Sequence, residues 1–315
     1  MLTVQNFSHD PFYNQAFEEY IYQTFPDDDV FLLWQNTPAV VVGSYQNICR
    51  EVHVESLRRL GIPVVRRMTG GGTVYHDLGN VNYTCMLRTN GVLNYDDVLL
   101  PVIHALNAIG VPARKNRVCD IAIGDLKISG SAQRMVRGRL LHHGTLLFSS
   151  DLSVLDQITT HRKNDCFQSR GTQSAICAVT NIQDHLAVPM TIQEFQVRLL
   201  EQMVPSGCPH LTLTPEQDAE VCRLRDEKYR SWEWTWGKTP AFTYEKSGIF
   251  AGVPIRAAYQ ARHGIVSDAV IDCAAIDGAL AARLLNGARL DPEGFAAVCR
   301  RLAGSAAEEL MDWLM

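Results

Sequence analysis

Three consecutive glycines at residues 70–72 separate two segments whose composition favours β-strand. PVVRR, residues 63–67, is rich in β-branched side chains, and TVYHD, residues 73–77, alternates apolar and polar ones. Because glycine adopts positive φ freely and has no Cβ, the run predicts a tight strand-to-strand connection that another group can approach closely. Neither a P-loop nor a Rossmann dinucleotide fingerprint fits, since G-x-x-x-x-G-K is absent and a strand, not a helix, is expected after the glycines.

The same run has the features of an anion site. Successive backbone N–H groups in a glycine loop can form a concave nest for oxyanions. Arg66 and Arg67 alternate on the preceding strand, so one side chain is expected on the loop side and the other on the opposite side. An arginine suits phosphate because its planar group donates two parallel hydrogen bonds. A purely structural bend remains the alternative on these residues alone.

A second candidate is GDLKISGSAQ, residues 124–133. Gly124–Asp125 predicts a hairpin turn, and Lys127 lies in the strand that follows it. A lone strand lysine is usually solvent-exposed. The small residues 129–132 would nevertheless let a ligand lie against the backbone.

The composition sets the class of protein. The chain has 315 residues, 46% hydrophobic and 20% charged, with a net charge of −5, which indicates a soluble globular protein without a broad nucleic-acid-binding surface. No apolar run approaches the roughly 20 residues of a membrane span, and the N-terminus lacks the features of a signal peptide. The 9 cysteines include no C-x-x-C pair, so we expect reduced thiols in a cytoplasmic protein, not disulfides or a zinc site.

The order of predicted elements indicates an α+β fold, because strands and helices follow one another without a regular βαβ period. We place a domain boundary near residue 240, which gives a domain of residues 1–240 and a smaller one of residues 241–315. The predicted helices cover residues 10–25, 52–61, 95–110, 151–158, 191–203 and 214–229, and the main predicted strand regions are 30–34, 39–45, 63–67, 73–87 and 117–149.

Four stretches then carry a family resemblance: RRMTGGGTVYHDLGN, DLKISGSAQ, HHGTLLFSSDL and SWEWTWGKTPAF. Together they resemble the lipoate–protein ligase A family of the biotin/lipoate ligase superfamily, and the resemblance covers nearly the whole chain. It implies a large mixed-sheet catalytic domain followed by a small α+β accessory domain. One departure is Cys119 before Asp120, where many such ligases have Asn-Asp, and it leaves the metal and adenine contacts open.

The resemblance implies an ATP-dependent ligase acting with Mg²⁺. Lipoate would be activated to lipoyl-AMP and then transferred to a lysine of apo lipoyl domains, in E2 subunits of 2-oxoacid dehydrogenases and in the glycine cleavage H protein. The enzyme is expected to act as a monomer, without nucleic-acid or membrane partners.

The resemblance also assigns residues to the site. Lys127 would contact the lipoate carboxylate, the α-phosphate and later the lipoyl-AMP carbonyl, and Asp120 would lie near the nucleotide or Mg²⁺. His76 is expected either to act as a base or to make a structural hydrogen bond, and the resemblance places it among the lipoate contacts. The remaining nucleotide contacts would come from Arg67, Gly72, Thr73, Val74 and Tyr75, and the remaining lipoate contacts from Trp34, residues 43–47, Gly70, Gly71 and His143.

Two alternatives stay open at this point. One is a lipoyl- or octanoyltransferase that takes preformed lipoyl-AMP or a lipoylated carrier protein, with Cys166 as a candidate nucleophile. The other is a non-catalytic binding protein on the same scaffold. The tryptophans at 232, 234 and 236 are expected to pack between the two domains.

Overall fold

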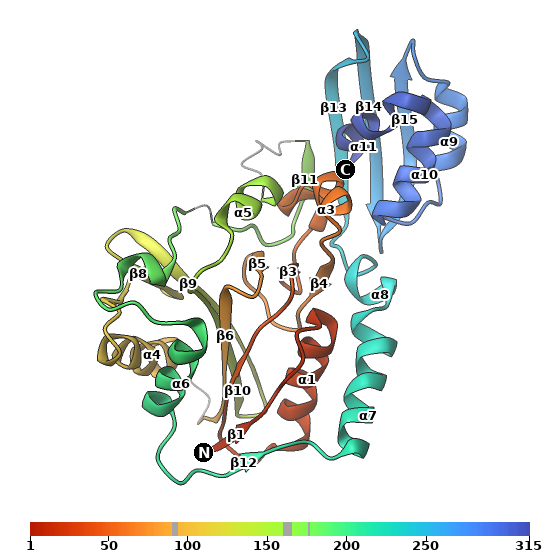
Figure 1. The fold of residues 1–315 in the computed structure, drawn as a ribbon. Helices are drawn as coiled ribbons and strands as arrows, with labels where there is room; N and C mark the ends of the chain where they lie inside the picture. The colour runs from red at the N-terminus through yellow and green to blue at the C-terminus, as the bar shows by residue number, and fades with distance from the viewer. Residues whose placement is uncertain (90–93, 160–165, 176) are drawn as a thin grey trace.

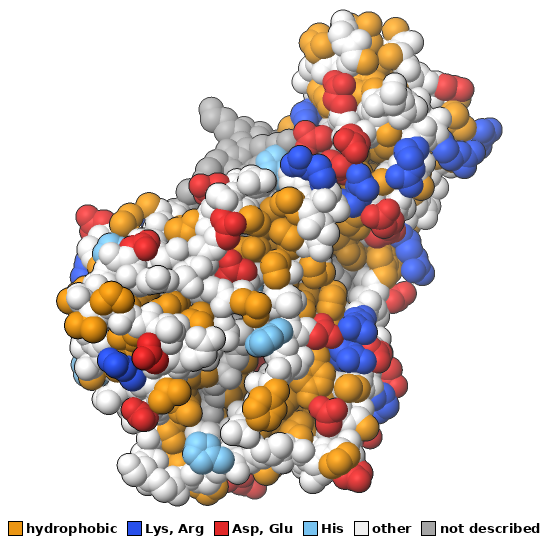
Figure 2. Space-filling view, viewed as in Figure 1, with side chains coloured by type: hydrophobic (Ala, Val, Ile, Leu, Met, Phe, Trp, Pro, Cys, Tyr) orange, Lys and Arg blue, Asp and Glu red, His pale blue; other side chains and the backbone are white. Residues whose placement is uncertain are grey.

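A computed structural model describes residues 1–89, 94–159, 166–175 and 177–315. Figure 1 shows a larger body that carries the N-terminus and a smaller lobe formed by the C-terminal residues. The space-filling view shows that the lobe stands off one end of the body (Figure 2). None of the helices in the described part of the chain is long and apolar enough to cross a membrane.

The larger body is built on an eight-stranded sheet. β12, β1 and β2 pair in parallel, and the strands from β2 onward pair antiparallel, which makes the sheet mixed. The predicted α+β mixed-sheet fold is therefore confirmed. The strands in spatial order are β12 (His210–Leu211), β1 (Leu2–Val4), β2 (Val30–Trp34), β6 (Asn80–Arg88), β10 (Arg139–Leu147), β9 (Leu126–Val136), β8 (Asp120–Ile123) and β7 (Arg114–Lys115).

Helices cover both faces of this sheet, as the alternation of buried residues along β2 requires. Figure 1 shows α4 and α6 on one side and α1 and α7 on the other. Phe31 packs in the core on the α4 and α6 side, whereas Val30 and Leu32 pack on the α1 side. The helices of the body are α1 (Pro11–Thr24), α2 (Ile48–Glu51), α3 (Val54–Leu60), α4 (Asp96–Ala108), α5 (Leu152–Ile158), α6 (Ile192–Met203), α7 (Pro215–Leu224) and α8 (Trp232–Thr235).

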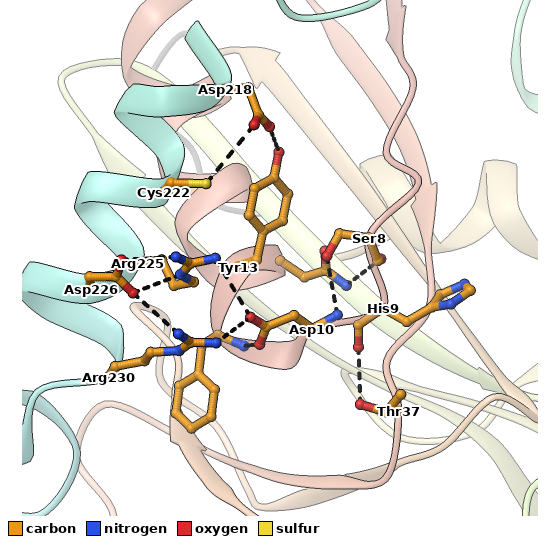
Figure 3. Close-up of polar contacts among 12 residues, drawn as sticks. Ser8, His9, Asp10, Tyr13, Thr37, Asp218, Cys222, Arg225, Asp226 and Arg230 are labelled. Atoms are coloured by element: carbon orange, nitrogen blue, oxygen red, sulfur yellow. Dashed lines mark hydrogen bonds and ion pairs between the residues drawn. The ribbon is translucent and has the colours of Figure 1, made fainter. Parts of the chain in front are cut away.

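The start of α1 follows the predicted capping. The Asp10 carboxylate accepts a hydrogen bond from Phe12 N at 2.9 Å, and Pro11 occupies the first helical position. Asp10 also accepts from Arg230 Nη2 at 2.8 Å, on the segment after α7 (Figure 3). That segment continues α7 as a π-helix over Arg225–Tyr229, so α1 and the α7 region are held together at this end.

A separate three-stranded sheet carries the glycine run. β4 (Val64–Arg66) and β5 (Val74–His76) both pair with β3 (Ala39–Val42), one on each side. The glycines therefore do not turn a hairpin between paired strands, because the connection from β4 to β5 has to cross the end of β3. A Cβ added to Gly43, directly after β3, would lie 2.3 Å from Gly71 O, and Gly71 has φ of +85°. Glycine is required at both crossing positions.

The C-terminal lobe is an antiparallel sheet with helices on one face. Its strands β13 (Phe242–Phe250), β14 (Val253–Arg262) and β15 (Ile265–Cys273) are joined at the edge by β11 (Phe167–Ser169). The predicted boundary at residue 240 falls just before β13, but β11 and the continuous hydrophobic core link the lobe to the body. The lobe's helices are α9 (Gly278–Leu285), α10 (Pro292–Ala303) and α11 (Ala307–Leu314).

The three alternating tryptophans lie on and beside α8, between lobe and body. Trp236 is buried in the core shared with the lobe, and Trp232 donates from Nε1 to Leu290 O at 2.9 Å. Trp234 packs on the α1 side and donates to Arg66 O at 2.7 Å. The expected packing between lobe and body is found for Trp232 and Trp236, whereas Trp234 packs within the body.

Arg66 connects these parts from inside the core. Its fully buried guanidinium donates to Thr235 O at 2.8 Å, Gly43 O at 2.8 Å and Gln46 O at 3.0 Å. Burial, with Arg67 nearby, lowers the pKa of Arg66 to about 10, so it remains cationic at neutral pH. One side chain therefore ties the loop after β3 to α8.

Arg66→Met should destabilise the protein by at least about 3 kcal/mol, because several buried carbonyls lose a charged donor. Urea unfolding at pH 7 measures the change in free energy. The matched control is Arg59→Met at an exposed helix position, which should change stability by less than about 0.5 kcal/mol. Equal, small effects of both substitutions would show that Arg66 does not hold the loop.

Candidate active site

A cavity of about 290 Å³ opens where the glycine loop faces the large sheet. One wall is the loop with β5, another is the β8–β9 hairpin, and a third is the segment of residues 172–175. The floor is formed by side chains of β2, β6 and β10 together with α1. Of the residues that the sequence assigns to a site, those that line this cavity are Trp34, Arg67, Gly71, Gly72, Thr73, Val74, His76, Asp120, Lys127 and His143.

Arg67 holds the shape of the glycine loop. Its Nη2 donates to Gly70 O and to Gly72 O, the latter at 2.7 Å, and its Nη1 donates to Val41 O at 3.1 Å. Burial lowers the pKa of Arg67 to about 10, so a full positive charge lies beneath the loop at neutral pH. The predicted alternation of the two arginines is confirmed: Arg67 lines the cavity, and Arg66 points into the core behind it.

The segment 172–175 closes the loop from the other side. Thr73 N donates to Ser174 Oγ at 2.8 Å, and Thr73 Oγ1 donates to Gln46 Oε1 at 2.9 Å. Ser174 is in turn held by the Glu51 carboxylate, which accepts from both Ser174 N and Ser174 Oγ. Burial raises the pKa of Glu51. Sequence reasoning missed Glu51 and Ser174, because their contact joins residues 123 positions apart. Gln46 was expected within residues 43–47 as a lipoate contact, whereas here it holds Thr73 and Ser174.

Lys127 and Asp120 form the charged end of the cavity. The Nζ of Lys127 lies 2.9 Å from Asp120 Oδ1, across the β8–β9 pair. A Cβ added to Gly130 would lie 2.8 Å from that Nζ, so the glycine leaves room for the ammonium group. The Lys127 side chain is 22% exposed, and it reaches the cavity instead of bulk solvent on the outer face of the strand.

His143 links the loop to a buried carboxylate. Its Nδ1 lies 2.9 Å from Glu18 Oε1, and its Nε2 lies 2.7 Å from Thr69 Oγ1. Arg67 Nε donates to the same hydroxyl at 3.0 Å, so the Thr69 proton points to Nε2 and Nδ1–H donates to Glu18. Glu18 also accepts from Thr84 Oγ1 at 2.7 Å. No pattern around Glu18, which lies in α1, indicated a functional role for it.

Trp34 and His76 form the uncharged end. Trp34 donates from Nε1 to Thr84 Oγ1 at 2.9 Å, and its ring meets the His76 ring edge-on at 5.9 Å between centroids. His76 Nδ1 lies 3.0 Å from Asn36 Nδ2. Burial lowers the pKa of His76 to about 3, so the ring is uncharged at neutral pH and is a weak base. The structure favours the structural hydrogen bond over general-base catalysis for this residue.

Several predicted residues do not reach the cavity. Tyr75 turns its side chain into the core shared with the lobe, so any contact with a ligand comes from its backbone. Gly70 does not line the cavity, and residues 43–47 lie behind the loop, where Tyr45 faces Gly70.

The structure also separates the cysteines. Cys166, next to residues 163–165 that lie outside the described residues, packs against the core of the lobe and does not line the cavity. Cys119 does line it, and burial together with Asp120 raises the pKa of the Cys119 thiol. Within the described residues, no group of three or more His, Cys, Asp or Glu could hold a metal ion.

Comparison with known proteins shows the family of this chain. Residues 10–204 match the model of the lipoyl protein ligase A/B catalytic domain. Lipoate–protein ligase 1 of Staphylococcus aureus is 33% identical over 268 residues, covering 83% of this chain and 81% of that protein. The chain belongs to the lipoyl protein ligase A/B family.

The fold of this chain also resembles solved structures of other proteins. A lipoate–protein ligase A crystallised with ATP has a TM-score of 0.63 at 25% identity, over 74% of this chain and 97% of that one. LipL1 of P. falciparum, crystallised with lipoate, has a TM-score of 0.64 at 21% identity over 100% of this chain and 98% of that one. The second match shows that the fold is shared across body and lobe.

His142 offers a test of the buried electrostatics beside the site. It stacks on Tyr83 on the side of the sheet away from His143, and burial, with His143 nearby, lowers its pKa to about 3. Since the unfolded pKa is about 6.5, the unfolded chain binds a proton below that pH and the native chain does not. Stability contributed by the neutral ring is complete above pH 6.5 and is lost as the pH falls toward 3.

Substituting His142→Phe should remove this pH dependence while keeping a ring in place. Between pH 7.5 and 5.5 the wild-type protein should lose about 1.4 kcal/mol more of its unfolding free energy than the variant. Urea unfolding at the two pH values gives the comparison. Identical losses in both proteins would contradict a buried, neutral His142.

Proposed function

We propose that this cavity is the single site at which the lipoate–protein ligase first joins lipoate to AMP and then passes the lipoyl group to an acceptor lysine. The observation that supports this most is the arrangement of charge. The Lys127 ammonium group lies at one end, the glycine loop over Arg67 forms the adjoining wall, and neutral aromatic groups lie at the other end. An acyl-adenylate has matching parts: a phosphate, a reactive carbonyl and an uncharged tail.

The activation step has to bring two anions together. A carboxylate oxygen of lipoate attacks the α-phosphorus of ATP, and pyrophosphate leaves with the electrons of the broken bond. Lys127 offsets the repulsion by donating to both anions, while Asp120 holds its ammonium group in place. Arg67 acts through the field of its buried charge and through the loop that it shapes.

The backbone of residues 72–75 would contact the nucleotide. Thr73 N already donates to Ser174 Oγ, so a nucleotide that takes this donor has to displace Ser174. The segment 172–175 would then shift. In the structure described here, Glu51 and Gln46 hold it through their hydrogen bonds to Ser174. We therefore expect this segment to adjust when ATP binds.

Mg²⁺ is proposed to enter with ATP. Asp120 is the only carboxylate among the described residues that line the cavity. One carboxylate suffices for Mg²⁺, which keeps several waters and binds mainly through substrate phosphates. The metal would neutralise charge on the leaving pyrophosphate.

In the transfer step the acceptor amine attacks the lipoyl carbonyl, and AMP leaves as the amine loses a proton. Lys127 is placed to stabilise the negative charge that develops on the carbonyl oxygen. The acceptors that we propose are apo lipoyl domains of 2-oxoacid dehydrogenase E2 subunits and the glycine cleavage H protein, as the family resemblance implies. No enzyme nucleophile is needed, which agrees with Cys166 lying outside the cavity.

The direct test is ATP dependence. The protein is incubated with lipoate and an apo lipoyl domain, with and without ATP and Mg²⁺, and the mass of the domain is followed. Modification should require ATP. If lipoyl-AMP supports modification while lipoate with ATP does not, the protein is a transferase and the activation step is wrongly assigned.

Lys127→Ala should lower the rate of ATP-dependent modification by about 10² to 10³-fold, because one transition-state donor is lost. The matched control is Lys115→Ala, a surface lysine that pairs with Asp96 and should leave the rate unchanged. Thermal unfolding of each variant checks that the fold is kept. Near-normal turnover by a folded Lys127→Ala protein would rule out the role of Lys127.

A further inference from the structure

The cavity runs across neighbouring strands of the large sheet. Gly130, beside Lys127, donates from its N to Thr145 Oγ1 at 3.2 Å; Thr145 is paired with Asn82, and Asn82 with Trp34. These four positions belong to β9, β10, β6 and β2, which are adjacent in that order. Three strand spacings correspond to roughly 14 Å. An acyl chain whose carboxyl group lies at Lys127 therefore directs its far end toward Trp34.

That far end contains buried polar atoms that have no partner. Gln15 Oε1, His76 Nε2 and Asn82 Nδ2 are enclosed and have no hydrogen-bond partner among the residues that the structure describes. The three side chains are 1%, 3% and 2% exposed, and all three line the cavity. Such groups are rare in native proteins, and each calls for an explanation such as a bound ligand.

The network around them fixes which atoms donate. Asn36 Oδ1 accepts from Asn14 Nδ2, so Asn36 Nδ2 donates to His76 Nδ1. The uncharged His76 therefore carries its proton on Nε2, which has no partner among the described residues. Asn82 Oδ1 accepts from Asn80 Nδ2 at 2.9 Å, which leaves the amide protons of Asn82 without a partner. The far end therefore presents two donors, from His76 and Asn82, and one acceptor, from Gln15.

We propose that Gln15, His76 and Asn82 form a sulfur-selective subsite for the end of the acyl chain, an inference that rests on the proposed function. A sulfur atom accepts weak hydrogen bonds, and a thiol also donates one. The dithiolane of lipoate can accept from His76 and Asn82, and the reduced dithiol can also donate to Gln15. A saturated straight chain leaves all three groups buried without partners, so octanoate is disfavoured.

The test compares lipoate, dihydrolipoate and octanoate on the intact protein. Binding constants come from calorimetry without ATP, and kcat/KM comes from the ligation assay. The wild type should favour both sulfur-bearing acids over octanoate by at least tenfold. Asn82→Leu and Gln15→Leu should each reduce that ratio at least fivefold, mainly by improving octanoate.

Ser150→Ala is the matched control, because Ser150 Oγ is another buried group without a partner but lies outside the cavity. It should leave the ratio unchanged. Equal binding of lipoate and octanoate by the wild type would overturn the subsite, and so would variants of Gln15 and Asn82 that keep the full preference.

Binding and ligation together separate this inference from the proposed function. Selective binding of sulfur-bearing acids without any ATP-dependent ligation would support the subsite and refute the ligase chemistry. Ligation that proceeds equally well with octanoate would support the ligase chemistry and refute the subsite.

Discussion

The site depends on one backbone crossing, where the loop from β4 to β5 passes over the end of β3. Gly43 and Gly71 make the crossing possible, since a Cβ at Gly43 would lie 2.3 Å from Gly71 O. Two buried guanidinium groups then fix it from either side. Arg66 donates to backbone carbonyls of the segment directly after β3, and Arg67 donates to carbonyls of the glycine loop. None of these acceptors is a carboxylate, and both guanidinium groups remain cationic at neutral pH.

The charges that line the cavity suit both of the proposed half-reactions. Lipoate, ATP and the acyl-adenylate each carry negative charge, which in the proposed function lies near Lys127 and the glycine loop over Arg67. The opposite end contains an uncharged histidine, an indole and two amides. In the proposed function, a ligand that is charged at one end and neutral at the other would be held in one direction, with its carbonyl near Lys127. Positioning of this kind supplies a large part of the catalysis in reactions that need no enzyme nucleophile.

Individual helices and turns could be predicted from the sequence more accurately than the way in which they lie next to one another in the fold. Glycine and proline signals placed α1, α3 and the hairpin turn at Gly124, because these signals act within a few residues. The glycine run was expected to join two strands, but its crossing over β3 depends on pairing between segments more than 20 residues apart. Lys127 became a strong candidate only through the family resemblance, since a strand lysine is usually exposed.

The residues that were missed share a cause. Glu51 and Ser174 lie 123 residues apart, and neither has a local pattern that marks it as functional. Gln15 and Asn82 belong to no recognisable motif. That Gln15 Oε1 and Asn82 Nδ2 have no hydrogen-bond partner among the described residues is known only once the fold has placed their neighbours. Burial and partner counts are properties of the folded chain, so composition and spacing could not supply them.

A structure of the protein with a non-hydrolysable lipoyl-AMP analogue tests the central claim most directly. We expect the phosphate analogue to lie within hydrogen-bond distance of Lys127 Nζ and against the backbone of residues 72–75. The dithiolane should lie between Trp34 and Asn82. An analogue bound in the reverse direction, or outside the cavity, would contradict the account.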